Sequence, residues 1–160
     1  MPSFGAAADT FWGELGELAD DRFHRALDYV GVDFFPDVFW SVPSGQLADA
    51  VRAVLTGFRV DALPRAGIGS AVPPRICENG WPTGPGRSEA RQAQVVEEVV
   101  RAVAGVAAEL TVVGYTFFAL RDADSAGPGL FHRFGLLRDD YTRKPAFDVY
   151  RKLVAELAVG

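Results

Sequence analysis

One glutamate stands at the end of a short apolar segment, where a carboxylate could do chemistry. The segment Arg75–Glu78 runs directly into a turn rich in glycine and proline, Asn79–Gly84. This pattern predicts a buried strand that ends at Glu78, the place where loops of parallel α/β proteins carry their functional residues. An ionised carboxylate in that position can act as a nucleophile. Taken alone, Glu78 also has a simpler interpretation, in which it caps the turn or pairs with an arginine.

Two other predicted strands also end in acidic, basic or aromatic residues. The first covers residues 29–35, a β-branched and aromatic segment that stops at Pro36. The third covers residues 111–120, a continuous apolar segment typical of a strand covered on both faces. Because parallel strands end at the same edge of a sheet, we expect one cluster around Glu78. Its members are the candidate substrate-binding residues Asp33, Phe35, Asn79, Trp81, Arg121 and Asp122.

Helical periodicity separates these strands. Apolar residues recur at helical spacing over 47–58, over 93–110 after the N-cap candidate Ser88, and from Pro145 to Leu157. A short helix is expected after Asp20, whereas residues 1–20 are expected to be irregular and residues 60–74 to form a connection. The alternating order predicts an α/β fold with a parallel sheet. No domain boundary is evident, so we expect one domain over residues 1–160.

Composition excludes several functional classes. The chain has 160 residues, 49% of them hydrophobic, which is enough for a globular core. Its net charge of −5 argues against a nucleic-acid partner or an anionic membrane surface. The single cysteine, Cys77, cannot form an internal disulfide. Neither a metal-ligand spacing nor a phosphate-binding loop is present, so we expect no metal and no cofactor. Without an apparent signal peptide or membrane segment, a cytoplasmic location is expected, although a complete relative could be secreted.

Three segments taken in order resemble a known enzyme family. They are DYVGVDFFPDVF (28–39), ICENGWPTG (76–84), and YTFFALRDADS (115–125) followed by FGLLRDDYTRKPAF (134–147). Together they resemble the last third, about strands six to eight, of a retaining glycoside hydrolase barrel of the β-glycosidase clan. The resemblance covers nearly all of residues 25–155. It implies a partial (β/α)8 TIM barrel of three to four parallel βα units, with residues 1–20 as a remnant of the preceding unit.

The resemblance also implies roles for individual residues. In that clan a glutamate closing the seventh strand, often followed by Asn-Gly, is the nucleophile, which makes Glu78 the catalytic residue. Asp33 and Phe35 then lie on the sixth strand, and Phe117 lies near the aromatic sugar platform. Trp81 and Trp40 could likewise stack against the apolar face of a sugar ring. For all three aromatic residues, simple packing is the competing interpretation.

Departures from the family pattern concern the proton donor, the length of the barrel, the tyrosine that orients the nucleophile, and the platform. The clan carries its acid/base glutamate in an Asn-Glu pair on the fourth strand, and this chain contains no such pair. A whole barrel of this class needs about 250 residues. The tyrosine that orients the nucleophile in many relatives is replaced by Phe34-Phe35, and the usual platform tryptophan by Phe117. The acids that could take the place of the missing proton donor are Glu14, Glu17, Asp122 and Asp124.

The sequence therefore supports two functional hypotheses. The first is hydrolysis of O-glycosidic bonds by a retaining mechanism, with Glu78 as nucleophile and a carbohydrate as substrate. The alternative is a non-catalytic carbohydrate-binding or assembly fragment of a degenerate glycosidase, or a truncated product without selected function. An open parallel sheet leaves unpaired edges, so a homo-oligomer or a partner chain completing the barrel is also expected.

Overall fold

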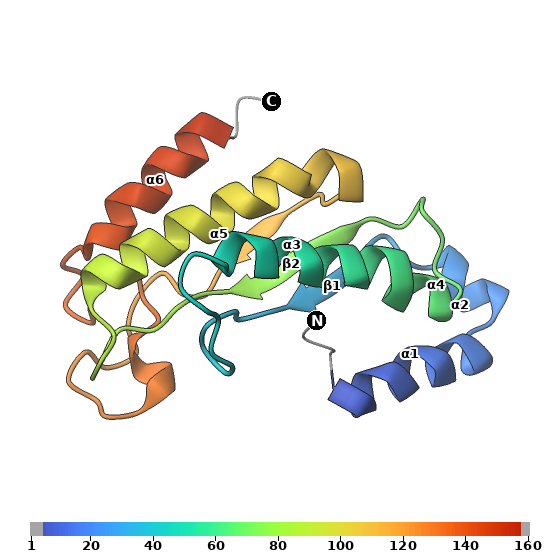
Figure 1. The fold of residues 1–160 in the computed structure, drawn as a ribbon, viewed down its shortest axis with the longest axis horizontal. Coiled ribbons are helices and arrows are strands. Elements are labelled where there is room, and N and C mark those ends of the chain that lie inside the picture. The colour runs from blue at the N-terminus through green and yellow to red at the C-terminus, as the bar shows by residue number, and fades with distance from the viewer. Residues whose placement is uncertain (1–4, 158–160) are drawn as a thin grey trace.

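A three-stranded parallel sheet in the order β1-β2-β3 forms the centre of the molecule (Figure 1). The computed structural model describes residues 5–157, with side chains in the first helix from Thr10 onward. The strands are β1 (Val30–Asp33), β2 (Pro74–Asn79) and β3 (Tyr115–Phe117). The helices that follow them are α3 (Leu47–Gly57), α5 (Glu89–Leu110) and α6 (Pro145–Leu157). This arrangement of successive parallel βα units confirms the predicted α/β fold class.

Helix α5 is the central helix of the layer that covers the sheet (Figure 1). It begins as predicted at Ser88, whose hydroxyl accepts a hydrogen bond from the Arg91 N–H at 3.1 Å. The predicted single apolar stripe is incomplete, because the helix has two buried faces. Val95 and Val99 belong to the core against the sheet, whereas Val96 and Val100 pack with α6.

The third strand is shorter than predicted. Thr111 adopts the left-handed conformation, with φ of 56°, and ends α5 rather than starting a strand. Only Tyr115–Phe117 pairs with β2 as a strand, and the Phe118–Ala119 peptide bond that follows is cis. A continuous apolar run cannot distinguish strand residues from the buried loop residues that flank them.

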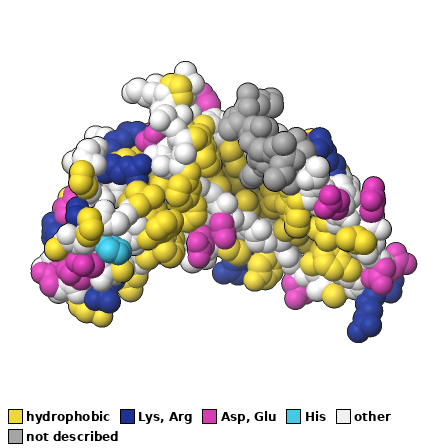
Figure 2. Space-filling model, turned by 90° about the horizontal axis from the view of Figure 1, so that it is seen from below, with side chains coloured by type: hydrophobic (Ala, Val, Ile, Leu, Met, Phe, Trp, Pro, Cys, Tyr) yellow, Lys and Arg dark blue, Asp and Glu magenta, His cyan; other side chains and the backbone are white. Residues whose placement is uncertain are grey.

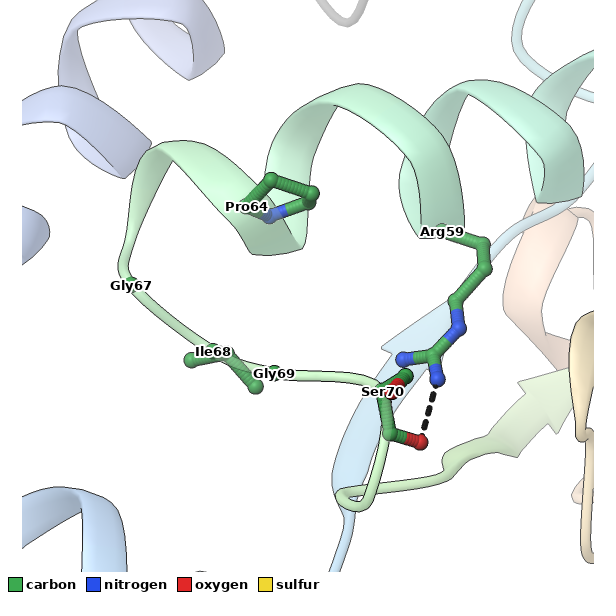
Figure 3. Close-up of a pocket in the computed structure, with 6 residues that line it drawn as sticks. All are labelled: Arg59, Pro64, Gly67, Ile68, Gly69 and Ser70. Atoms are coloured by element: carbon green, nitrogen blue, oxygen red, sulfur yellow. Dashed lines mark hydrogen bonds between the residues drawn. The ribbon is translucent and has the colours of Figure 1, made fainter.

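The predicted connection at residues 60–74 begins as helix. The turn that follows α3, Phe58–Ala62, has π-helical hydrogen bonding and continues into α4 (Leu63–Arg65). The Arg59 guanidinium donates to the Ser70 carbonyl at 2.6 Å (Figure 3). It also donates to the Val72 carbonyl at 3.0 Å. These bonds join the end of the helix to the loop that enters β2, and a cavity of about 320 Å³ lies between them.

The prediction that residues 1–20 are irregular is wrong for the part that the structure describes; residues 1–4 lie outside it. Gly5–Leu18 forms helix α1, and α2 (Asp21–Arg25) follows, with Asp20 accepting a hydrogen bond from the Phe23 N–H at 2.7 Å. Trp12 packs edge-on against Phe58, with ring centroids 5.6 Å apart. This tertiary contact stabilises a helix whose own glycines disfavour it.

Helix α1 packs against α4, at the end of the sheet where the strands begin (Figure 1). A Cβ atom at Gly16 would clash with the Arg65 carbonyl oxygen, so the absence of a side chain there permits the close approach. Within residues 5–157, none of the helices has the length and apolar character required to cross a membrane.

Candidate functional site

Asp33 and Glu78 lie side by side at the carboxyl ends of β1 and β2. Their Cα atoms are partners in the parallel ladder, and both side chains are exposed. The face of the sheet that α3 and α5 cover is buried, so both carboxylates lie on the uncovered face. Neither carboxylate has a hydrogen bond or an ion pair with another residue in the 5–157 range. Figure 2 shows acidic side chains among hydrophobic ones between the two lobes of the molecule.

An aromatic cluster borders the same strand ends. Phe35 makes edge-on contacts with Phe39, Phe118 and Phe134, at centroid distances of 5.8, 6.1 and 5.8 Å. Phe39 is 56% exposed, so part of the cluster is open to solvent. Phe35 was among the predicted site residues and Phe118 was not, although two adjacent aromatic residues, 117 and 118, indicate that one ring faces each side of the chain.

Asn79 is buried, and its side chain makes hydrogen bonds within the sheet. It is only 3% exposed, and its amide N–H donates to the Phe34 carbonyl at 2.7 Å. The Tyr115 hydroxyl donates to its side-chain oxygen at 2.6 Å. Asn79 therefore links all three strands from within, and this placement corrects its expected role in substrate binding.

The burial of Tyr115 leads to a prediction for alkaline pH. Burial raises the pKa of Tyr115 well above its ordinary value of 10.0, and Tyr150 adds to the effect. The folded protein thus keeps a proton that the unfolded chain loses, so stability falls as the pH rises above about 10, by at most about 1.4 kcal/mol per pH unit. Tyr115→Phe should reduce this loss in urea unfolding measured between about pH 8 and pH 11. An unchanged alkaline slope in the variant would contradict the assignment; Lys144 and Tyr150 titrate in both proteins.

Trp81 and Phe117 also lie in packing contacts instead of facing the rim, the edge of the sheet where the strands end. Trp81 is 4% exposed, its indole N–H donates to the Asp37 carbonyl at 3.2 Å, and Arg87 lies over its ring. The ring of Phe117 packs against Tyr150 of α6, with centroids 5.4 Å apart. For both residues the structure places the ring in packing contacts, so neither is positioned as the expected sugar platform. Trp40, by contrast, is 39% exposed.

Asp122 is buried in an ion pair. Its side chain and that of Lys144 are each 1% exposed, and the Nζ–Oδ1 distance is 2.7 Å. The Gly135 N–H and the Ser125 hydroxyl donate to the same carboxylate at 2.8 and 2.9 Å. Burial lowers the pKa of Lys144, and the Asp122 carboxylate acts in the opposite direction. Asp122 thus holds the loop after β3 in place and is enclosed too completely to contact a substrate.

The remaining expected residues have contacts or positions of their own. Arg121 is exposed, donates to the Asp139 carbonyl at 2.9 Å and lies over the Tyr141 ring. Among the substitute acids, Asp124 accepts hydrogen bonds from the Ala126 and Gly127 N–H groups, both at 2.9 Å. The other two, Glu14 and Glu17, are exposed on α1, at the far end of the sheet. Across residues 5–157, no group of three His, Cys, Asp or Glu side chains is arranged to hold a metal ion.

Known glycoside hydrolases share this fold. A GH2 β-galacturonidase from Eisenbergiella tayi, bound to glycerol, superposes with a TM-score of 0.62 at 19% identity over 81% of this chain and 24% of its own. A Bifidobacterium dentium β-glucuronidase, complexed with coumarin-3-O-glucuronide, gives 0.58 at 20% identity over 82% of this chain and 21% of its own. A GH5_18 variant from Bifidobacterium longum subsp. longum, in complex with Manβ1-4GlcNAc, gives 0.60 at 14% identity, covering 83% and 31%.

These similarities establish the fold and its extent. The chain spans between about a fifth and a third of the length of these three enzymes. No protein-family model matches the sequence, and no curated protein matches it. The structure is an α/β fold like one part of a glycoside hydrolase.

Proposed function

We propose that this chain takes part in the hydrolysis of O-glycosidic bonds by a retaining mechanism, with Glu78 as the nucleophile. The observation that carries the proposal is an exposed carboxylate at the carboxyl end of the central strand, in a fold shared with GH2 and GH5 glycoside hydrolases. In such a mechanism one carboxylate attacks the anomeric carbon, while a second carboxyl group protonates the departing oxygen. The adjoining aromatic cluster offers an apolar surface for a sugar ring.

The placement of the neighbours suits a nucleophile. Asn79 is locked between Phe34 and Tyr115, so the residue that follows Glu78 cannot shift freely. At Gly80 a Cβ atom would clash with the Phe118 carbonyl oxygen, and only glycine permits this close approach of β2 to the segment after β3. The backbone that follows Glu78 is therefore held in place, which is what a reacting group requires.

A mechanism-based label tests the proposal. The chain is incubated with 2,4-dinitrophenyl 2-deoxy-2-fluoroglycosides, whose good leaving group needs no protonation, including glucuronide, galacturonide and mannoside forms. We expect intact-mass spectrometry to detect one added glycosyl group and peptide mapping to locate it on Glu78. Glu78→Gln should abolish the label, whereas Glu109→Gln, at an exposed position of α5, should retain it.

The alternative is a carbohydrate-binding or assembly module. It is favoured by the open edges of β1 and β3 and by an apolar groove of about 460 Å³ beside β3, lined in part by Val113, Tyr150, Val154 and Leu157. A second copy or a partner chain could cover these surfaces, and light scattering would detect self-association. If sugars bind while no fluoroglycoside labels the chain, and Glu78→Gln leaves binding unchanged, the binding module replaces the hydrolase as the proposed function.

A further inference from the structure

Two arginines line a pair of adjoining cavities between the loop after β2 (residues 80–88) and the loop after β3 (residues 118–144). One cavity has a volume of about 320 Å³ and the other a volume of about 330 Å³. The residues that both cavities share are Thr83, Gly84, Arg87 and Arg133. Each cavity is several times larger than the volume of about 30 Å³ that a water molecule occupies in the liquid, so an ion of a few atoms fits.

Hydrogen bonds fix the backbone on both sides of these cavities. The Thr83 N–H donates to the Arg133 carbonyl at 2.9 Å, which joins the two loops (Figure 1). Gly84 and Arg87 bond to each other through both backbone N–H groups, each at 2.9 Å. The Arg133 Nε–H donates to the Gly127 carbonyl at 2.9 Å, and Arg133 Nη1 lies 3.6 Å from the position of a Cβ atom at Gly84. Both guanidinium groups therefore approach the shared part of the cavities from fixed backbone positions.

The charges of these two arginines have no acidic partner. Neither Arg87 nor Arg133 forms an ion pair with a carboxylate of residues 5–157. Both side chains are half-buried, and Arg87 donates to the Val38 carbonyl at 3.1 Å and lies over the Trp81 ring. The Arg87 Nη1 atom is buried and has no hydrogen-bond partner in the part of the chain that the structure describes. Withdrawing a cation from water without a counterion costs free energy, so an anion in the cavities would be stabilised.

The other charged residues of the cavity walls pair with one another. Lys144 Nζ lies 2.7 Å from Asp122 Oδ1, and the Arg138 guanidinium donates to both carboxylate oxygens of Glu89, each at 2.7 Å. The cavities are lined by four cationic and two acidic side chains, which leaves an excess of two positive charges. This local excess contrasts with the net charge of −5 of the whole chain.

We propose that these cavities bind a doubly charged tetrahedral oxyanion, a phosphate or sulfate group. Two unbalanced guanidinium groups match the charge of a phosphate group at neutral pH, about −1.5 to −2. They also match its geometry, because each guanidinium presents N–H donors in a planar fork that suits phosphate oxygens. Glu78 lines neither cavity, so this binding does not depend on the catalytic role proposed for Glu78.

Isothermal titration calorimetry with sodium phosphate tests the site, at neutral pH and at an ionic strength held constant with chloride. We expect saturable binding of one phosphate per chain. Arg133→Gln and Arg87→Gln should each weaken this binding by at least about tenfold, because hydrogen bonds between charged groups contribute that much or more. The matched control is Arg22→Gln, which removes the same charge from an exposed position of α2 and should bind phosphate as the unsubstituted chain does.

A second measurement locates the anion in the unsubstituted chain, so its result does not depend on whether the arginine variants fold. In nitrogen–proton correlation spectra of the labelled chain, added phosphate should shift the amide resonances of Gly84 and Gly129, which line the smaller cavity. The resonance of Gly57, at the end of α3, should not move.

Three further titrations identify the anion and its source. Sulfate should bind as phosphate does, and acetate should bind at least about tenfold more weakly, because it carries a single charge. Glucose 6-phosphate that binds more tightly than phosphate, with no binding of glucose, would identify a phosphorylated sugar as the source of the anion. An equal or lower affinity for glucose 6-phosphate would identify the free ion.

The proposal is overturned by any of three results. Phosphate binding that does not saturate, or that leaves the Gly84 and Gly129 resonances in place, would show that the cavities hold no anion. Equal affinities of Arg133→Gln, Arg87→Gln and Arg22→Gln would show that the two arginines do not bind it. Acetate bound as tightly as phosphate would contradict the match to a double charge.

Discussion

Asp122→Ala should destabilise the protein by about 3–5 kcal/mol, because it would leave the Lys144 ammonium buried without its carboxylate. Among residues 5–157, the hydrogen-bond partners left to the Lys144 ammonium would be the Thr83 hydroxyl at 3.0 Å and the Arg133 carbonyl at 3.3 Å. The Gly135 N–H would also lose its acceptor. Urea unfolding at neutral pH measures the loss directly.

Two control variants distinguish the stability contributed by the buried Asp122–Lys144 pair from that of an ordinary surface ion pair. Asp148 pairs with Arg151 at 3.1 Å on the surface, with side chains 54% and 66% exposed, and Asp148→Ala should cost less than about 1 kcal/mol. Replacing both buried partners, as Asp122→Leu with Lys144→Met, should restore much of the stability lost in the single variant. A single Asp122→Ala variant as stable as Asp148→Ala would show that water reaches Lys144.

Phe134→Ala should cost about 3–5 kcal/mol, the range for removing a buried aromatic side chain. Phe134 is 1% exposed, and its ring contacts those of Phe35, Phe118 and Phe131. Phe134 is thus the buried member on which the other rings of the aromatic cluster pack, and its loss would leave a cavity beneath them.

Phe131 provides the matched control for this second prediction. Its ring stacks on Phe134 with centroids 5.9 Å apart, but its side chain is 62% exposed. Phe131→Ala should therefore cost less than about 1.5 kcal/mol in the same urea experiment, since an exposed side chain loses mainly its ring contacts with Phe134 and Phe39. Equal losses of stability in Phe134→Ala and Phe131→Ala would mean that burial of Phe134 does not stabilise the cluster.

Local sequence patterns were sufficient for the main elements of the fold. The helix after Ser88 was predictable because its cap and its apolar spacing both act within a few residues of chain. The parallel order followed from strands that alternate with helices, and the position of Glu78 at a strand end followed from the turn behind it. Helix α1 was not predictable, because its stability comes from contacts of Trp12 with a residue far away in sequence.

The sequence by itself determined which residues end the three strands, and hence which side chains could gather near Glu78. Only the tertiary structure decided which of them face the rim, because a one-residue bulge or a buried partner reverses the direction of a side chain. Asp33 and Glu78 meet through the bulge at Cys77, while Asp122 is drawn inward by Lys144, a residue 22 positions further along the chain. Local spacing in the sequence predicts neither arrangement, since both depend on which segments lie beside each other after folding.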